Sequence, residues 1–258
     1  MGRLARIAGD FGEITILRSR KGGSQIYMQG EGLQSHADSA GVSLSYYIHA
    51  LYGLVMQTRA RDVLMIGCGG GTLGTMLARV GRNVTIVDID PVSFALARSY
   101  FALPPAIKCA IGDGAAFLRR CRRSCDALVV DAFIGDKVPP HLRSETFFRV
   151  ARARLRPRGY ILVNVLLAND RDPTADGIAA AMTKAGLTVQ LLDTPGDVDR
   201  NAIVVGSRGR PLERPSLLVV PRRDRKPIAD ALGEMRFRPW RRRGHPASAL
   251  TLPRLTGL

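Results

Sequence analysis

The sequence predicts an α/β protein built on a mostly parallel sheet. From Asp62 to about Ser207, short apolar runs rich in β-branched residues alternate with segments of helical spacing. The runs are apolar throughout, which is typical of strands buried on both faces of a parallel sheet. The chain has 258 residues, 46% of them hydrophobic, and can bury one large core. We therefore expect one main domain, residues 43–207, with a smaller segment on each side.

The N-terminal segment, residues 1–42, is predicted to be a small β element. Its strands are expected at EITILRS and SQIYMQG, with RKGG as the turn between them. The main domain then begins with SLSYYIHALYGLVMQ, where Leu44, Tyr47, Leu51 and Leu54 recur at helical spacing. We expect a helix there that leads into the first strand of the sheet.

The main domain is predicted to alternate strands with helices. The strands are expected, in chain order, at DVLMIG, NVTIVDID, AIKCAIGD, DALVVDAF, GYILVNVL, LTVQLLD and NAIVVGS. Helices are expected over residues 72–80, 91–101, 115–121, 144–155 and 174–185. The last two strands are joined by TPGDVDR, which is too short for a crossover helix. They are therefore predicted to form an antiparallel hairpin at one edge of the sheet.

Residues 208–258 are predicted to be a basic C-terminal extension. From Ser207 onward the chain has 13 Lys or Arg and 4 Asp or Glu, so 13 − 4 = +9 of the net charge of +16 falls there. We interpret this as a solvated or partly disordered tail, in which PSLLVV could add one strand. No RNP-type aromatic motif, zinc finger or helix-turn-helix signature accompanies the charge, which argues against a nucleic-acid partner, although the basic tail leaves one open.

The sequence also predicts a cytoplasmic protein without a membrane partner or a metal. The N-terminus has no uninterrupted apolar stretch of signal-peptide length, and no segment approaches the roughly 18 apolar residues of a membrane span. The four cysteines show neither paired spacing nor nearby histidines suited to zinc, so we expect free thiols.

A glycine loop and three acids follow four successive predicted strands. The first strand ends in Gly67, Cys68, Gly69, Gly70 and Gly71, where missing side chains let a ligand approach the backbone. Asp88, Asp113 and Asp131 follow the next three strands. Ligands of open α/β sheets bind at these carboxyl ends, and an acid about 20 residues after the loop can accept bonds from ribose hydroxyls, as Asp88 would. Asp88 and Asp113 could instead be helix N-caps.

The charge of these acids predicts the kind of ligand. An anionic dinucleotide would face three carboxylates without a counter-charge, whereas a nucleoside with a positive sulfonium would be attracted. S-adenosylmethionine or its decarboxylated form fits as a co-substrate.

The chain resembles the spermidine synthase (polyamine aminopropyltransferase) family. The resemblance rests on QGEGLQS, YYIH, VLMIGCGGGTL, VTIVDIDP, IGDGAAFL, DALVVDAF and FFRVARARLRPRGYILVN, between roughly Ile14 and Val205. It implies a Rossmann-like class I methyltransferase sheet after a small N-terminal β domain, and a homodimer. It also implies that Gln34 contacts the amino-acid-like tail of the nucleoside, that Asp113 and Gly114 contact adenine, and that Gly67, Gly69, Gly71 and Asp88 complete the nucleoside site. Asp131 and Tyr47 would act on the substrate side.

The catalytic loop departs from the pattern of this family. The family has a second acid three residues after the first, where this chain has Ile134, and Asp136 lies two residues later. A loop of different geometry could still present Asp136 as a base. The sequence also indicates few carboxylates near the cleft for a polyamine, and the positive net charge disfavours a cation.

Three functions therefore remain open. The first is aminopropyl transfer to an amine such as a polyamine. The second is methyl transfer from S-adenosylmethionine to a small molecule, with an RNA methyltransferase as a variant that charge alone supports. The third is a non-catalytic protein that retains the nucleoside site. In aminopropyl transfer, Asp131 would orient the amine and Asp136 could act as the base, whereas in methyl transfer Asp131, with Tyr47 or His141, would position a neutral or anionic acceptor.

Overall fold

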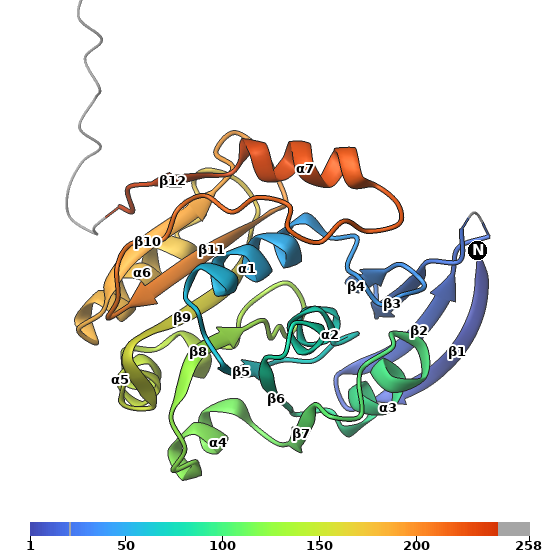
Figure 1. Ribbon diagram of the computed structural model, residues 1–258, viewed down its shortest axis with the longest axis horizontal. Helices are drawn as coiled ribbons and strands as arrows, with labels where there is room; N and C mark the ends of the chain where they lie inside the picture. The colour runs from blue at the N-terminus through green and yellow to red at the C-terminus, as the bar shows by residue number, and fades with distance from the viewer. Residues whose placement is uncertain (21, 242–258) are drawn as a thin grey trace, which may run out of the picture.

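The computed structural model describes residues 1–20 and 22–241, and it contains two sheets (Figure 1). The N-terminal sheet has four antiparallel strands in the order β1-β2-β3-β4. Their bounds are β1 (Gly2–Gly9), β2 (Gly12–Arg18), β3 (Gln25–Gln29) and β4 (Gly32–Ala37). The predicted β element is therefore present, with two strands, β1 and β4, that the sequence pattern did not indicate.

The main sheet has eight strands in the order β12-β10-β11-β9-β8-β5-β6-β7. Their bounds are β5 (Asp62–Ile66), β6 (Asn83–Asp88), β7 (Lys108–Ile111), β8 (Cys125–Val130), β9 (Leu155–Leu167), β10 (Thr188–Asp193), β11 (Arg200–Ser207) and β12 (Arg236–Arg238). Strands β5 to β9 are parallel, and β11 runs antiparallel to both β9 and β10. The predicted α/β class with a mostly parallel sheet is confirmed.

Helices cover both faces of the main sheet (Figure 1). Their bounds are α1 (Tyr46–Gln57), α2 (Thr72–Arg79), α3 (Pro91–Tyr100), α4 (Gly114–Arg120), α5 (Glu145–Ala153), α6 (Thr174–Lys184) and α7 (Arg225–Glu234), with a short 3-10 helix over Pro140–Arg143. One core lies between the sheet and α1, α2 and α7, and a second lies between the sheet and α4, α5 and α6. This two-sided burial explains why the strands are apolar throughout.

The C-terminal segment differs from the prediction of a solvated tail. Residues 208–241 pack onto the domain, where α7 contacts α1 and buries Ile228 and Leu232. These two residues are four positions apart and form an apolar helix stripe that the high net charge obscured. The remainder of the basic extension, residues 242–258, lies outside the described residues.

Two strand predictions near the C-terminus are also corrected. The β10–β11 hairpin is antiparallel as predicted, but β12 pairs with β10 and takes the edge position. PSLLVV forms no strand, and its Leu218 and Val220 are exposed. Prolines at positions 211, 215 and 221 remove backbone donors from this stretch, whereas Phe237 supplies both an amide and an apolar side chain beside Leu192.

Candidate functional site

Two adjoining cavities lie at the carboxyl ends of the parallel strands. We call the first the glycine-loop cavity; it is lined by Gly67, Asp88, Asp113, Gly114 and His141, among others. The second, the acidic cavity, has a volume of about 610 Å³ and is lined by Tyr47, Asp131, Asp136, Asp199 and Asp224, among others. The two cavities share Gln34, Cys68, Gly69, Asp131 and Phe133. A ligand in one can therefore meet a ligand in the other beside Asp131.

The glycine loop lacks side chains mainly because neighbouring atoms leave no room for them. Gly67 has φ +99, and a Cβ there would lie 2.0 Å from the main-chain oxygen of Asp131. Gly71 has φ +64, the left-handed conformation that an L side chain rarely adopts. The sequence suggested that the missing side chains serve ligand approach, and the structure adds that they allow β5 and β8 to end side by side.

Most of the loop's amide groups are already bonded within the protein. Among residues 67–71, Gly67 donates to Val87 O, Cys68 to Asp88, Gly70 to Ser35 Oγ and Gly71 to Cys68 O. A phosphate-binding loop needs such N–H groups free to face the anion. The loop is therefore poorly suited to a pyrophosphate, which agrees with the prediction of a nucleoside without phosphates.

Asp88 at the end of β6 bridges the loop and its own turn. Its Oδ2 accepts a hydrogen bond of 2.6 Å from Cys68 N, and its Oδ1 accepts one of 2.8 Å from Asp90 N. Burial raises the pKa of this carboxyl, although the two amide bonds oppose the shift. Each carboxylate oxygen can accept a second hydrogen bond, so Asp88, which lines the glycine-loop cavity, could accept bonds from ribose hydroxyls there.

Asp113 caps a helix and also lines the same cavity. Its Oδ1 accepts from Ala116 N at 2.7 Å, as an N-cap of α4, and its Oδ2 lies 2.7 Å from Nε2 of His141. Burial alone would raise the pKa of Asp113, but the bonds from Ala116 N and His141 outweigh it and the pKa is lowered. Capping and cavity lining are thus combined in one residue, and His141 joins the site from the 3-10 helix.

Gly114 follows Asp113 and is required by packing. A Cβ at this position would lie 2.4 Å from a side-chain carbon of Ile66 at the end of β5. This brings the start of α4 against β5 and keeps the floor of the glycine-loop cavity close to the sheet.

Asp131 at the end of β8 is held by a chain of two amides. Asn164 on β9 donates to Oδ1 of Asp131 at 2.8 Å, and Asn201 on β11 donates to Oδ1 of Asn164 at 3.0 Å. Burial raises the pKa of Asp131 to about 6, and the bond from Asn164 opposes that shift. The carboxyl is therefore ionised at neutral pH yet basic enough to accept a proton.

Two tyrosines from the start of α1 form another wall of the acidic cavity. Their rings meet edge to face with centroids 6.3 Å apart. The hydroxyl of Tyr46 accepts a bond of 3.0 Å from Asn201 N, which ties α1 to β11. Burial, then the charge of Asp131, raises the pKa of Tyr47 well above its ordinary value, so this residue is a neutral hydrogen-bonding group beside Asp131.

The turn after β8 presents the acid that the sequence left uncertain. Ile134 and Lys137 exchange two backbone hydrogen bonds, so Gly135 and Asp136 form the tip of a tight turn. Asp136 lines the acidic cavity, whereas Ile134 lines the glycine-loop cavity and is 56% exposed. Asp136 is thus placed on the same cavity as Asp131, although it lies two residues beyond the family's position.

Four functional candidates in the acidic cavity were missed by sequence reasoning: Asn164, Asn201, Asp199 and Asp224. Asn164 was visible in GYILVN, but an amide in a strand carries no chemical signature. Asp199 and Asp224 have positive φ values of 47° and 54° and no hydrogen bond or ion pair through their side chains within the described residues. Non-glycine residues in this conformation are uncommon and recur at functional sites, which is a signal only a structure provides.

The charge of the acidic cavity corrects another expectation. The sequence appeared to offer few carboxylates for a cationic acceptor. Instead, Asp131, Asp136, Asp199 and Asp224 all line this cavity, and no Lys, Arg or His is among the described residues that line it. The local field is therefore negative in spite of the net charge of +16.

The sequence predictions on metal ligands, membrane-spanning helices and cysteines can also be compared with the structure. Within residues 1–20 and 22–241, no group of three or more His, Cys, Asp or Glu could hold a metal ion. None of the helices in that part of the chain is long and apolar enough to span a membrane. The cysteines are free thiols, as predicted.

Fold and site together define a class I methyltransferase fold, and comparisons with known proteins agree. Residues 63–159 match a family described as a methyltransferase domain. A probable spermidine synthase from Corynebacterium glutamicum has the same fold, with a TM-score of 0.76 at 18% identity over 96% of this chain and 99% of that one. A spermidine synthase in complex with the transition-state analogue AdoDATO has a TM-score of 0.61 at 17% identity over 81% of this chain and 74% of that one.

The curated relatives include both aminopropyltransferases and a methyltransferase. A probable polyamine aminopropyl transferase of Bifidobacterium longum is 32% identical over 132 residues, which are 50% of this chain and 30% of the relative. A polyamine aminopropyltransferase of Vibrio vulnificus is 29% identical over 46% of this chain and 42% of the relative. An N-terminal histidine N-methyltransferase of Emericella nidulans is 33% identical over 45% of this chain and 22% of the relative. The chain spans less than half the length of each of these relatives. The predicted resemblance to the spermidine synthase family is confirmed by the aminopropyltransferases among them and by the fold.

Proposed function

We propose that this protein transfers an aminopropyl group from decarboxylated S-adenosylmethionine to an amine that carries more than one positive charge. The observation that carries the proposal is the acidic cavity, which joins the glycine-loop cavity at Asp131. Four carboxylates without a basic neighbour would stabilise a di- or polycation and would repel an anionic acceptor.

The residues of the glycine-loop cavity suit the donor. Asp88 would accept bonds from the ribose, and Asp113 with Gly114 would lie against adenine, while Gln34 reaches both cavities. Among the described residues that line the two cavities, His141 is the only basic one, and it is engaged with Asp113. A donor that keeps its carboxylate would find no Lys or Arg there, which favours the decarboxylated form.

The chemistry asks little of the protein beyond alignment and proton removal. The bound sulfonium supplies an electrophilic carbon attached to positive sulfur. The acceptor ammonium first loses a proton, the nitrogen lone pair so freed attacks that carbon, the carbon–sulfur bond breaks with its electrons going to sulfur, and the product nitrogen remains as a secondary ammonium. Asp131, ionised at neutral pH, would orient the amine and accept this proton, with Asp136 as the alternative base.

A product assay tests the proposal. Purified protein is incubated with putrescine and the decarboxylated donor, and the products are separated by chromatography; we expect spermidine and the neutral thioether nucleoside in equal amounts. Asp131→Asn should abolish the product while retaining nucleoside affinity in calorimetry. Absence of spermidine at high protein concentration, with retained donor binding, would contradict the proposal.

The methyltransferase reading remains as a second candidate, because the matched family is described as a methyltransferase domain and one relative is named as an N-methyltransferase. Calorimetry with the two forms of the donor discriminates between the readings. Tighter binding of S-adenosylmethionine than of its decarboxylated form, together with a methylated product, would select this reading.

A further inference from the structure

A group of exposed basic residues lies at the edge of the main sheet opposite the two cavities. Strands β5 to β9 are parallel, so their first residues share one edge, which we call the amino edge. Register pairs fix its course: Asp62 lies beside Asn83, and Cys125 beside Leu155. Because β11 is antiparallel, its last residue, Ser207, also lies here, beside Tyr160.

Ten exposed cations lie at or within a few residues of these positions. They precede or begin the parallel strands, or follow β11. They are Arg59, Arg61, Lys108, Arg120, Arg122, Arg123, Arg158, Lys184, Arg208 and Arg210. Within residues 1–20 and 22–241 none of the ten forms a side-chain ion pair or hydrogen bond. Their charge is therefore available to an external partner.

Acids at this edge do not balance the charge. Asp62 and Asp126 are both bonded to Arg156, which the ten cations do not include. Glu213 lies nearby through its amide bond to Gln57 and is a single further acid. At the opposite edge, where the parallel strands end, acidic residues line the two cavities. The two edges of the sheet therefore have opposite charge.

Helix dipoles explain only part of this arrangement. A cation in the last turn of a helix is stabilised by the negative end of the dipole, as at Arg120 and Lys184. Arg122 and Arg123, in the loop after α4, and Arg158, near the start of β9, lie beyond a helix end and gain nothing comparable. Mutual repulsion among unpaired cations costs free energy, which an anionic partner would offset.

We infer that the amino edge binds the phosphate backbone of a nucleic-acid duplex without reading its sequence. Seven strands from β10 to β7, spaced about 4.8 Å apart, make this edge roughly 30 Å long, which is close to one turn of a duplex. Eight of the ten cations are arginines, whose planar guanidinium can bind a phosphate through two hydrogen bonds. This inference is independent of the proposed transfer reaction.

A duplex fits this surface better than a single strand or a membrane. Single-strand binding uses exposed aromatic side chains on which bases stack. Among the described residues Phe11 is the one exposed aromatic side chain, and it lines the glycine-loop cavity. Membrane binding through an interface needs exposed apolar side chains beside the cations, and Val80, at 44% exposure, is the large apolar residue that this edge exposes.

Two matched triple variants test the inference. One removes Arg120, Arg122 and Arg123 from the amino edge, each replaced by Ala. The other removes Arg3, Arg18 and Arg20, which lie in or just after strands of the N-terminal sheet, are exposed, and form no side-chain ion pair or hydrogen bond within the described part of the chain. Both change the net charge equally, and neither touches the cavities. Binding of a fluorescent duplex of about 20 base pairs, as DNA and as RNA, is measured by anisotropy between about 50 and 200 mM salt.

The amino-edge triple variant should lower affinity about tenfold, and it should reduce the slope of log affinity against log salt by about 3, one for each phosphate contact. The N-terminal triple variant should change affinity less than twofold. DNA and RNA duplexes that bind alike support backbone recognition. Equal weakening by both triples would mean that net charge alone acts, and would overturn the inference.

Two further arms give outcomes that decide the partner. A single strand of equal length that binds as tightly as the duplex would overturn the duplex assignment. Vesicles of phosphatidylcholine and phosphatidylserine that bind the protein, and are not displaced by duplex, would assign the surface to membranes. Methylthioadenosine affinity, measured by calorimetry on both triples, should stay within twofold of the unsubstituted protein, which shows that the fold and the glycine-loop cavity are intact.

Discussion

The side-chain amide of Asn164 lies 2.8 Å from Oδ1 of Asp131 and donates to it. The orientation of this amide is fixed from both sides, because an ionised carboxylate accepts only, and because Asn201 donates to the oxygen of the same amide. Asp131 thus turns one oxygen toward Asn164, and its other oxygen would be available to the proposed acceptor. Asn164 and Asn201 are positioning residues for the proposed base.

Loss of this amide bond should make Asp131 a weaker acid. Hydrogen bonds to charged groups are worth about 1.5–3 kcal/mol, so Asn164→Ala should raise the acidic limb of the pH profile of kcat/KM from about 6 by one to two pH units. Activity falls as pH drops through the limb, because protonated Asp131 cannot accept the proton.

The second amide of the chain should act through the first. Asn201→Ala should move the limb in the same direction by a smaller amount, and Asn83→Ala, at the far edge of the sheet, should leave it unmoved. A limb that stays in place in Asn164→Ala, with kcat reduced, would show a purely structural role.

Ionised Asp131 should cost the protein stability. A carboxyl whose pKa is raised from 3.8 to about 6 is destabilised in its charged form by up to about 3 kcal/mol at neutral pH. The folded state holds its proton longer than the unfolded state, so stability is full below pH 4 and is lost as pH rises through 6. Asp131→Asn should therefore raise Tm by several degrees at pH 7.5 and leave it nearly unchanged at pH 4, as measured by calorimetry. A lower Tm at pH 7.5 would refute this.

The nucleoside assignment is tested at Asp88. Asp88→Ala removes the charge-assisted bonds to a ribose and should weaken methylthioadenosine binding by about 1–3 kcal/mol in calorimetry. The bonds from Cys68 N and Asp90 N are lost as well, so the variant's Tm must be compared. Asp88→Asn keeps an acceptor and should retain part of the affinity. Unchanged affinity in a folded Asp88→Ala protein would refute the ribose role.

The residues of the glycine-loop cavity could be predicted from the sequence because they share one position relative to the strands. Gly67, Asp88, Asp113 and Asp131 each lie at, or within two residues after, the end of a parallel strand, and the ends of parallel strands meet at one edge. The same rule gave the sheet and its two-sided helices. Local pattern and global fold agree in these elements, which is where prediction is most reliable.

The acidic cavity could not be reached in the same way. Asp199 lies in the β10–β11 turn and Asp224 precedes α7, so neither follows a parallel strand. The basic C-terminal segment packs on α1 through Ile228 and Leu232. This packing joins residues far apart in the sequence, and the net charge of the segment gives no indication of it. The mistaken expectation of few carboxylates came from this missing tertiary contact.

The two acids with positive φ should govern acceptor affinity. Asp224→Asn and Asp199→Asn each remove one negative charge from the acidic cavity, and Asn also tolerates the left-handed conformation. Each substitution should raise KM for putrescine about tenfold while methylthioadenosine affinity stays within twofold. Asp230→Asn, in an exposed ion pair with Lys226 on α7, is the matched control and should change neither. If Asp224→Asn and Asp199→Asn have the same KM for putrescine as the unsubstituted protein and the control, these two acids do not take part in acceptor binding.

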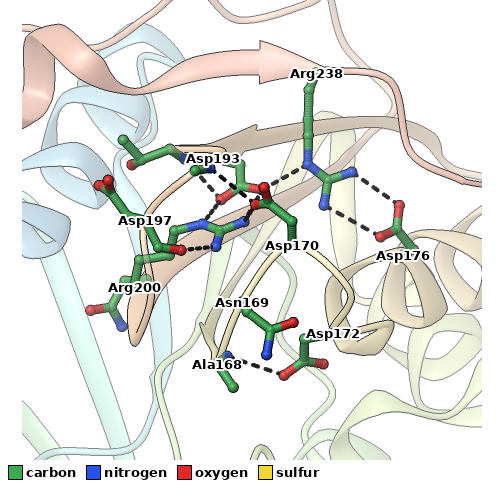
Figure 2. Close-up of polar contacts among 12 residues, drawn as sticks. Ala168, Asn169, Asp170, Asp172, Asp176, Asp193, Asp197, Arg200 and Arg238 are labelled. Carbon is green, nitrogen blue, oxygen red and sulfur yellow. Dashed lines mark hydrogen bonds and ion pairs between the residues drawn. The ribbon is translucent and has the colours of Figure 1, made fainter.

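A buried ion network fastens the C-terminal segment to the sheet (Figure 2). Asp193 on β10 is 0% exposed and accepts from Arg200 Nε at 2.8 Å and from Arg238 Nε at 2.7 Å. Arg238, on β12, also binds Asp176 with both Nη groups. Burial would raise the pKa of Asp193, but the two guanidinium groups outweigh it and the pKa is lowered. The network therefore holds β12 beside β10 and carries the chain from α7 back to the sheet.

Removal of either arginine should destabilise the protein to a different degree. Arg200→Met leaves Asp193 partly uncompensated in the core and should lower the free energy of unfolding by about 3 kcal/mol. Arg238 is only half-buried, so Arg238→Met should lower it by about 1 kcal/mol. Because the pKa of Asp193 is lowered, this stability is present above pH 4 and is lost as pH falls through the folded pKa, so the deficit of Arg200→Met should shrink in acid. Urea unfolding at pH 7 and at pH 3.5 measures both effects, with exposed Arg225→Met as the neutral control. An Arg200→Met deficit that is the same at both pH values would show that lost packing, rather than the unpaired Asp193 charge, causes the destabilisation.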